Sequence, residues 1–182
     1  APMMVSPEQH QVIERLLCAS LILPGDVVEA GCNAGSTSRL LAHWLISTSR
    51  NLHLFDSFEG LPPSSGFGGL MTATRSSLES AICEQCGTES VPPHVKIHEG
   101  WFRSTMPQKL PEQICFAFAD CDLYESMIDA IKPILPRLTG VMVLHDFTHE
   151  RWGSGVRRAV SELGLIVTER EGMAIAWKAD QC

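Results

Sequence analysis

The sequence predicts an α/β fold with a mostly parallel sheet that ends in a C-terminal antiparallel hairpin. Short apolar runs, typical of buried strands, alternate with stretches in which apolar residues recur at helical spacing. Such alternation is typical of a parallel sheet with helices packed on it. The last two predicted strands, 165–170 and 173–178, are separated only by Glu171 and Gly172, so they must run antiparallel.

Length and composition favour a single domain over residues 1–182. The chain has 182 residues, of which 45% are hydrophobic, enough for a substantial core. Its net charge of −7 disfavours a nucleic-acid partner. No apolar run approaches the roughly 20 residues that cross a bilayer, and no signal peptide is visible. We therefore expect no membrane association and a cytoplasmic location, which an odd number of cysteines, seven, also fits.

The first elements are a helix, a strand, a second helix and a second strand. The helix over 6–22 begins with Ser6 as its N-cap, Pro7 at its first position and Gln9 completing a capping box. Apolar residues at helical spacing follow. Beyond it the pattern predicts a strand over 26–30, a helix over about 36–47 and a strand over 52–55.

Residues 57–74 are predicted to form a lid. Most of this segment is rich in Gly, Pro and Ser and has no periodicity, and such long loops in compact domains are usually functional or mobile. The elements predicted downstream are helices near 75–86, over about 124–138 and over 153–163, and strands at 94–98, 114–119 and 141–144.

A glycine-rich turn after the first strand is a candidate cofactor loop. Gly31 and Gly35 permit a tight turn and a close approach to a ligand, but their spacing is not the GxGxxG of dinucleotide sites. Asp56 ends the second strand, where a carboxylate can bind ribose hydroxyls. Glu29 suits an ammonium group on charge grounds. These features together favour S-adenosylmethionine (SAM) as the cofactor. The alternative is that the glycines only form the turn between the strand and the helix and that Asp56 caps a helix.

Acidic residues follow two buried strands. Asp120 and Asp122 come after the strand 114–119, and His145 and Asp146 after 141–144. Open α/β sheets bind ligands beyond the carboxyl ends of their strands, so we expect these side chains to meet there. They offer enough groups for a divalent metal and a base. The alternatives are that Asp122 caps the next helix and that His145 lies in the sheet crevice with its hydrogen bonds made within the protein and binds no metal.

Five stretches of the chain resemble the macrocin O-methyltransferase family of SAM-dependent, metal-dependent enzymes. The DSFEGLP and DxDLYES stretches are specific, whereas the glycine turn is generic. The resemblance implies a Rossmann-like class I methyltransferase sheet of seven strands whose last two form the hairpin. The five stretches are residues 25–35, 56–62, 100–107, 120–126 and 145–147.

The resemblance also implies methyl transfer from SAM to a hydroxyl of a small molecule, such as a sugar on a natural product. Asp122 would be the general base, and Asp120 and Asp146 would bind the metal. His145 is a further candidate ligand, and it stands where the family usually has an aspartate. Magnesium is the expected metal, although imidazole suits zinc, iron, manganese or nickel better. The expected cofactor contacts are Glu29, Gly31, Cys32, Asn33, Gly35, Ser36, Asp56, Ser57, Phe58, Gly100, Trp101, Phe102 and Asp120.

Several alternatives stay open from the sequence. Because His145 stands in place of an aspartate, the chain could also be a non-catalytic SAM-binding module that has lost its metal site. An NAD-dependent oxidoreductase is disfavoured by the missing GxGxxG. A zinc site can be drawn from Cys83, Cys86, His94 and His98, but the spacing is shorter than a zinc finger normally uses. The expected partner is a small-molecule hydroxyl acceptor, and a homodimer is left open.

Overall fold

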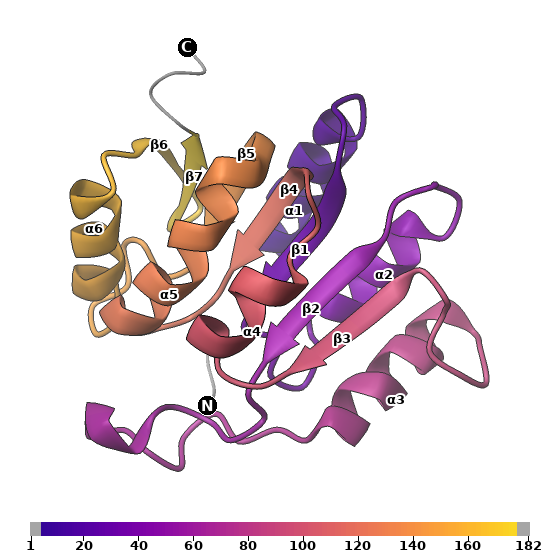
Figure 1. The fold of residues 1–182 in the computed structure, drawn as a ribbon, viewed down its shortest axis with the longest axis horizontal. Helices are drawn as coiled ribbons and strands as arrows, with labels where there is room; N and C mark the ends of the chain where they lie inside the picture. The colour runs from indigo at the N-terminus through magenta and orange to yellow at the C-terminus, as the bar shows by residue number, and fades with distance from the viewer. Residues whose placement is uncertain (1–4, 178–182) are drawn as a thin grey trace.

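A computed structural model describes residues 5–177 and shows a seven-stranded sheet between two helical layers (Figure 1). The strand order is β3-β2-β1-β4-β5-β7-β6. Only β7 runs against the others, and it pairs with β5 on one side and β6 on the other. This confirms the predicted fold class, hairpin included. The strands are β1 (Asp26–Ala30), β2 (Leu52–Asp56), β3 (Val95–Glu99), β4 (Ile114–Ala119), β5 (Leu138–Leu144), β6 (Ile166–Arg170) and β7 (Met173–Trp177).

Three helices cover each face of the sheet and share a separate apolar core with it. Buried residues of α1 (Pro7–Ser20), α2 (Ser38–Leu45) and α3 (Arg75–Cys86) pack in one cluster. Those of α4 (Phe102–Lys109), α5 (Tyr124–Ile134) and α6 (Gly153–Glu162) pack in the other. The strand β4 lies centrally between these layers, and all six of its residues are buried. No described helix is long and apolar enough to span a bilayer.

The local signals place most elements correctly, and the differences have physical reasons. The capping box of Ser6 and Gln9 is present at the start of α1. The sequence does not predict α4, because Met106 is its only buried residue and Pro107 lies inside it. The helix expected to reach 138 ends at Ile134, and a 3₁₀ turn, η2 (Leu135–Arg137), leads straight into β5. Lys178, the predicted end of the last strand, lies outside the described residues.

The parallel register brings four strand ends to one edge of the sheet. Ala30 of β1 pairs with Phe55 of β2 and with Ala119 of β4, which in turn pairs with Leu144 of β5. The helices that follow β1 and β4, α2 and α5, lie on opposite faces. The chain therefore diverges beyond this edge, as it does at the ligand-binding crevice of open α/β sheets.

Candidate active site

A cavity of about 200 Å³ lies beyond the carboxyl ends of β1, β2 and β4. Gly35, Phe58 and Gly100 do not line it; all three have positive φ angles and shape the neighbouring loops. The other ten of the thirteen residues expected at the cofactor do line it: Glu29, Gly31, Cys32, Asn33, Ser36, Asp56, Ser57, Trp101, Phe102 and Asp120.

The carboxylate of Asp56 ties two loops together. Its Oδ2 atom accepts hydrogen bonds from the backbone N–H groups of Cys32 (2.8 Å) and Asn33 (2.9 Å), and Oδ1 accepts from that of Phe58 (2.8 Å). Asp56 thus holds the glycine turn in place, in addition to lining the cavity. It does not cap a helix, because β2 leads into a loop here. Each carboxylate oxygen has two lone pairs, so Oδ1 can still accept from a ligand.

Glu29 presents a buried carboxylate to the same cavity. The residue is 1% exposed, and its Oε2 atom has no hydrogen-bond partner among the described residues. Burial raises the pKa of Glu29 to about 8, and the nearby charges of Asp120 and Asp56 add to the effect. A buried carboxylate without a partner is costly unless a positive group pairs with it. This site therefore fits the ammonium group of a ligand such as SAM.

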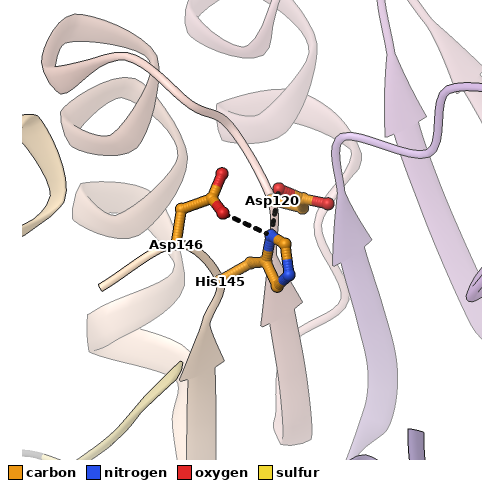
Figure 2. A group of neighbouring side chains, drawn as sticks. All are labelled: Asp120, His145 and Asp146. Carbon is orange, nitrogen blue, oxygen red and sulfur yellow. Dashed lines mark hydrogen bonds and ion pairs between the residues drawn. The ribbon is translucent and has the colours of Figure 1, made fainter. Parts of the chain in front are cut away.

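Asp120, His145 and Asp146 form a tight cluster where β4 and β5 end (Figure 2). Nδ1 of His145 lies 3.0 Å from Oδ1 of Asp120 and 3.2 Å from Oδ1 of Asp146. Burial alone would lower the pKa of His145, but the charges and hydrogen bonds of the two carboxylates raise it to about 10. The cluster thus concentrates negative charge around one ring nitrogen.

The same three residues suit a divalent cation. One ligand atom from each lies within 4.8 Å of the others, and this is the only group of its kind among the described residues. Two carboxylate oxygens and one imidazole nitrogen fit manganese, iron, nickel or zinc better than magnesium. The sequence prediction of a metal site thus corresponds to residues that the fold brings together.

Asp122 lies on the loop between β4 and α5 and lines the cavity. Burial raises its pKa to about 8, and the charges of Asp120 and Asp146 contribute. The N-cap of α5 is Leu123, and no side chain caps the helix. The capping alternative is therefore wrong, and the carboxylate of Asp122 remains available to a ligand.

Some cavity residues carry no signal in the local sequence. Val5 and Thr37 line the cavity because α1 and α2 pack beside it. The expected lid contributes five lining residues, and its Phe67 ring meets Trp152 edge-on at 5.0 Å. The lining residues that the sequence prediction missed are Val5, Ala34, Thr37, Gly60, Leu61, Pro62, Met71, Cys121 and Ser126.

The CxxC pair does not form a zinc site. Cys83 and Cys86 lie in α3, while Nε2 of His94 contacts the carbonyl of Ala42 and His98 stacks on a phenylalanine. No metal-binding group in the described chain includes any of the four candidate residues. Both cysteines are half-buried free thiols, and Cys86 packs against the apolar core.

Two curated proteins are similar to the chain. The first, 8-demethyl-8-(2,3-dimethoxy-alpha-L-rhamnosyl)-tetracenomycin-C 4'-O-methyltransferase of Streptomyces olivaceus, is 26% identical over 178 residues, covering 86% of this chain. The second, demethyldecarbamoylnovobiocin O-methyltransferase of Streptomyces niveus, is 26% identical over 140 residues, covering 69% of it. The chain spans only 66% and 53% of the lengths of these two proteins.

Solved structures share the fold at low sequence identity. The O-methyltransferase NovP superposes with a TM-score of 0.83 at 18% identity, over 98% of this chain and 82% of its own. The calicheamicin methyltransferase CalS11 superposes with a TM-score of 0.76 at 21% identity, over 97% of this chain and 82% of its own. An O-methyltransferase from Bacillus cereus in complex with SAH superposes with a TM-score of 0.65 at 13% identity, over 98% of this chain and 84% of its own.

A family model gives the firmest assignment. The model of the macrocin O-methyltransferases (TylF) matches residues 8–164, which include the acidic cluster and every residue of the cavity lining except Val5. This match confirms the resemblance carried by the DSFEGLP and DxDLYES stretches. The chain belongs to the macrocin O-methyltransferase family.

Proposed function

We propose that this chain transfers a methyl group from SAM to a hydroxyl group of a small molecule. One observation carries the proposal: a single cavity is lined by the unpartnered carboxylate of Glu29, by the glycine turn and by the carboxylates of Asp120, Asp122 and Asp146. Groups suited to binding SAM thus adjoin groups suited to activating a hydroxyl. Family membership supports the same reaction.

The cofactor half of the cavity follows from the charge and shape of its residues. SAM, when bound, supplies a methyl group activated by its positively charged sulfur. The carboxylate of Glu29 pairs with the ammonium group, and Asp56 accepts hydrogen bonds from the ribose hydroxyls. Trp101 and Phe102 offer apolar ring surface to the adenine. Gly31 lets the backbone approach the ligand closely.

The acceptor half works by proton removal. As the hydroxyl oxygen bonds to the methyl carbon, the bond from that carbon to the sulfur of SAM breaks, S-adenosylhomocysteine is released, and Asp122 takes the hydroxyl proton. A base with a pKa of about 8 is well matched to neutral pH. Asp120, His145 and Asp146 would hold a divalent cation, which would supply positive charge to lower the pKa of a nearby hydroxyl. Magnesium is the family expectation, while the imidazole favours manganese or another transition metal.

The names of similar proteins point to a sugar as the acceptor. One curated relative is named as a 4'-O-methyltransferase of a rhamnosyl-tetracenomycin, and a further structure of CalS11 as a TDP-rhamnose 3'-O-methyltransferase. We therefore propose that the acceptor is a sugar hydroxyl, free or attached to a natural product. The second candidate is a SAM-binding module without turnover, which His145 favours because it replaces an acidic metal ligand.

Calorimetric titration with S-adenosylhomocysteine (SAH) tests the cofactor assignment. We expect a Kd in the micromolar range, about −8 kcal/mol, and no binding of NADH by the same sample. Binding of NADH but not SAH by folded protein would refute the proposal. Rhamnosylated acceptors are then assayed with SAM and with Mg²⁺, Mn²⁺ or chelator. Methyl transfer separates the enzyme from the non-catalytic module.

A further inference from the structure

We infer that Gln9, in the N-terminal helix, positions His145 so that its Nδ1 atom faces a divalent cation. Gln9 lies 136 positions from His145 in the chain and does not line the cofactor cavity. Its side-chain oxygen Oε1 is 3.3 Å from Nε2 of His145. The inference rests on the proposed metal site and adds a residue that none of the strand-end motifs contains.

Two backbone groups fix the orientation of the Gln9 amide. The N–H of Ser6 donates to Oε1 at 2.8 Å, and Nε2 of Gln9 donates to the carbonyl of Glu171 at 2.9 Å. A backbone N–H can only donate and a carbonyl can only accept. A reversed amide would lose both hydrogen bonds. The atom that faces His145 is therefore an oxygen.

This oxygen determines the tautomer of His145. An amide oxygen only accepts, so Nε2 of His145 carries the hydrogen that it donates to Gln9. In a neutral imidazole the other nitrogen then holds the free lone pair. That nitrogen, Nδ1, is the atom turned toward Asp120 and Asp146 (Figure 2). Without a cation, a hydrogen on Nδ1 links this nitrogen to the two carboxylates. A divalent cation would take the place of that hydrogen and bind Nδ1 and both carboxylates.

The surroundings explain why a fixed partner matters. His145 also borders a second cavity of about 310 Å³, together with Gln9 and the hairpin turn at Glu171 and Gly172. Water in such a cavity both donates and accepts, so without Gln9 it would stabilise either tautomer. The hairpin turn is itself held, because Thr148 N–H donates to the Gly172 carbonyl at 3.2 Å. Gln9 thus connects a helix cap, a hairpin turn and a metal ligand.

Cation binding to the full chain tests this role. Mn²⁺ is titrated without cofactor, and free Mn²⁺ is followed by electron paramagnetic resonance. Gln9→Met keeps the side-chain length but removes the amide oxygen, and we expect the Kd for Mn²⁺ to rise about 10- to 100-fold, as when an outer partner of a metal ligand is lost. Gln9→Glu keeps an acceptor oxygen and should restore most of the affinity.

Ser6→Ala is the matched control. It removes the Ser6 hydroxyl that accepts from the Gln9 N–H at 3.2 Å, but it keeps the Ser6 N–H that orients the amide. It therefore weakens the helix cap without freeing the amide, and we expect Mn²⁺ affinity within about twofold of the wild type. Equal losses in Ser6→Ala and Gln9→Met would mean that Gln9 acts only through helix stability, and would overturn the inference.

A nitrogen-15 spectrum of the histidines adds a readout that helix stability does not move. In the Zn²⁺-loaded wild type we expect His145 to carry hydrogen on Nε2 alone, and in Gln9→Met that single form should be lost. Unchanged spectra and Mn²⁺ affinity in Gln9→Met would refute the role. Wild-type protein that binds SAH but neither Mn²⁺ nor Zn²⁺ would refute the role of Gln9 and leave the cofactor assignment standing. Mn²⁺ binding that depends on Gln9, without any SAH binding, would instead refute the proposed function and leave the role of Gln9 standing.

Discussion

The backbone carbonyl oxygen of Asp120 occupies the space that a side chain at Gly31 would need. Gly31 also has a φ angle of +86°, which other residues adopt only with strain. The ends of β1 and β4 are thus packed backbone against backbone at the cavity. This close approach joins the glycine turn to the acidic cluster, and a change on one side displaces the other.

Replacing Gly31 by alanine should abolish SAH binding. The new Cβ must displace the Asp120 backbone, because a main-chain carbonyl cannot rotate away as a flexible side chain does. We expect at least about a 100-fold loss of SAH affinity by calorimetry, equivalent to about 2.7 kcal/mol. Gly66→Ala is the control, since Gly66 also has a positive φ but a Cβ there meets no atom within 4 Å. Wild-type affinity in Gly31→Ala would contradict the close packing.

Asp122→Asn should reduce turnover without weakening cofactor binding. The amide keeps the shape of the carboxylate but cannot take a proton, and general-base catalysis typically contributes about 10²- to 10⁴-fold. We expect kcat to fall by that factor while the Kd for SAH stays unchanged. Asp129→Asn, in the middle of α5, is the comparison and should be fully active. Full activity in Asp122→Asn would exclude it as the base.

Glu29 should make the protein less stable as the pH rises. Its folded-state pKa of about 8 lies above the ordinary value of 4.5, so the folded state holds a proton that the unfolded chain has lost. The stability from this group is present below pH 4.5 and is lost as the pH rises through 8. Urea unfolding from pH 5 to 9 should show the free energy of unfolding falling by up to about 1.4 kcal/mol per pH unit relative to Glu29→Gln. A constant difference between the two proteins would contradict this.

His98 should make the protein sensitive to acid. Its ring stacks on Phe55 at 4.5 Å and on His53 at 5.3 Å, and burial, with the neighbouring charge of His53, lowers its pKa to about 4. The stability from neutral His98 is present above pH 6.5 and is lost as the pH falls through 4. The melting temperature of wild type should therefore fall more between pH 6.5 and 4 than that of His98→Phe. The exposed His43, replaced by Phe, should leave the acid sensitivity in place.

The contact between Phe67 and Trp152 should hold the segment 57–74 over the cavity. Edge-on aromatic pairs contribute about 0.5–1.5 kcal/mol, so removing the Phe67 ring should raise the open population about 2- to 12-fold. Limited proteolysis of Phe67→Ala should cut this segment correspondingly faster, and SAH should protect it less. Leu70→Ala changes an exposed side chain, 45% accessible, in the same segment and serves as the control. Equal cleavage in both variants would argue against the contact.

Local pattern was sufficient for the architecture and for the edge at which the site lies. The strands alternate with helices, and two residues between the last strands allow only a hairpin. Because parallel strands end at the same edge, Asp120 and Asp146 could be expected to meet from sequence alone. The helix α4 was missed because its single buried side chain gives no periodicity.

The sequence by itself determined the fold class, the family and the identity of the strand-end residues, because each depends on short-range spacing. Only the tertiary structure decided which side chains touch. It left Asp122 free of the helix cap, turned Nδ1 of His145 toward two carboxylates, and brought Gln9 against the other ring nitrogen. These contacts depend on how helices and strands pack together. The apolar positions of α1 indicate a buried face, but no local pattern indicates that Gln9 would meet His145, 136 positions away.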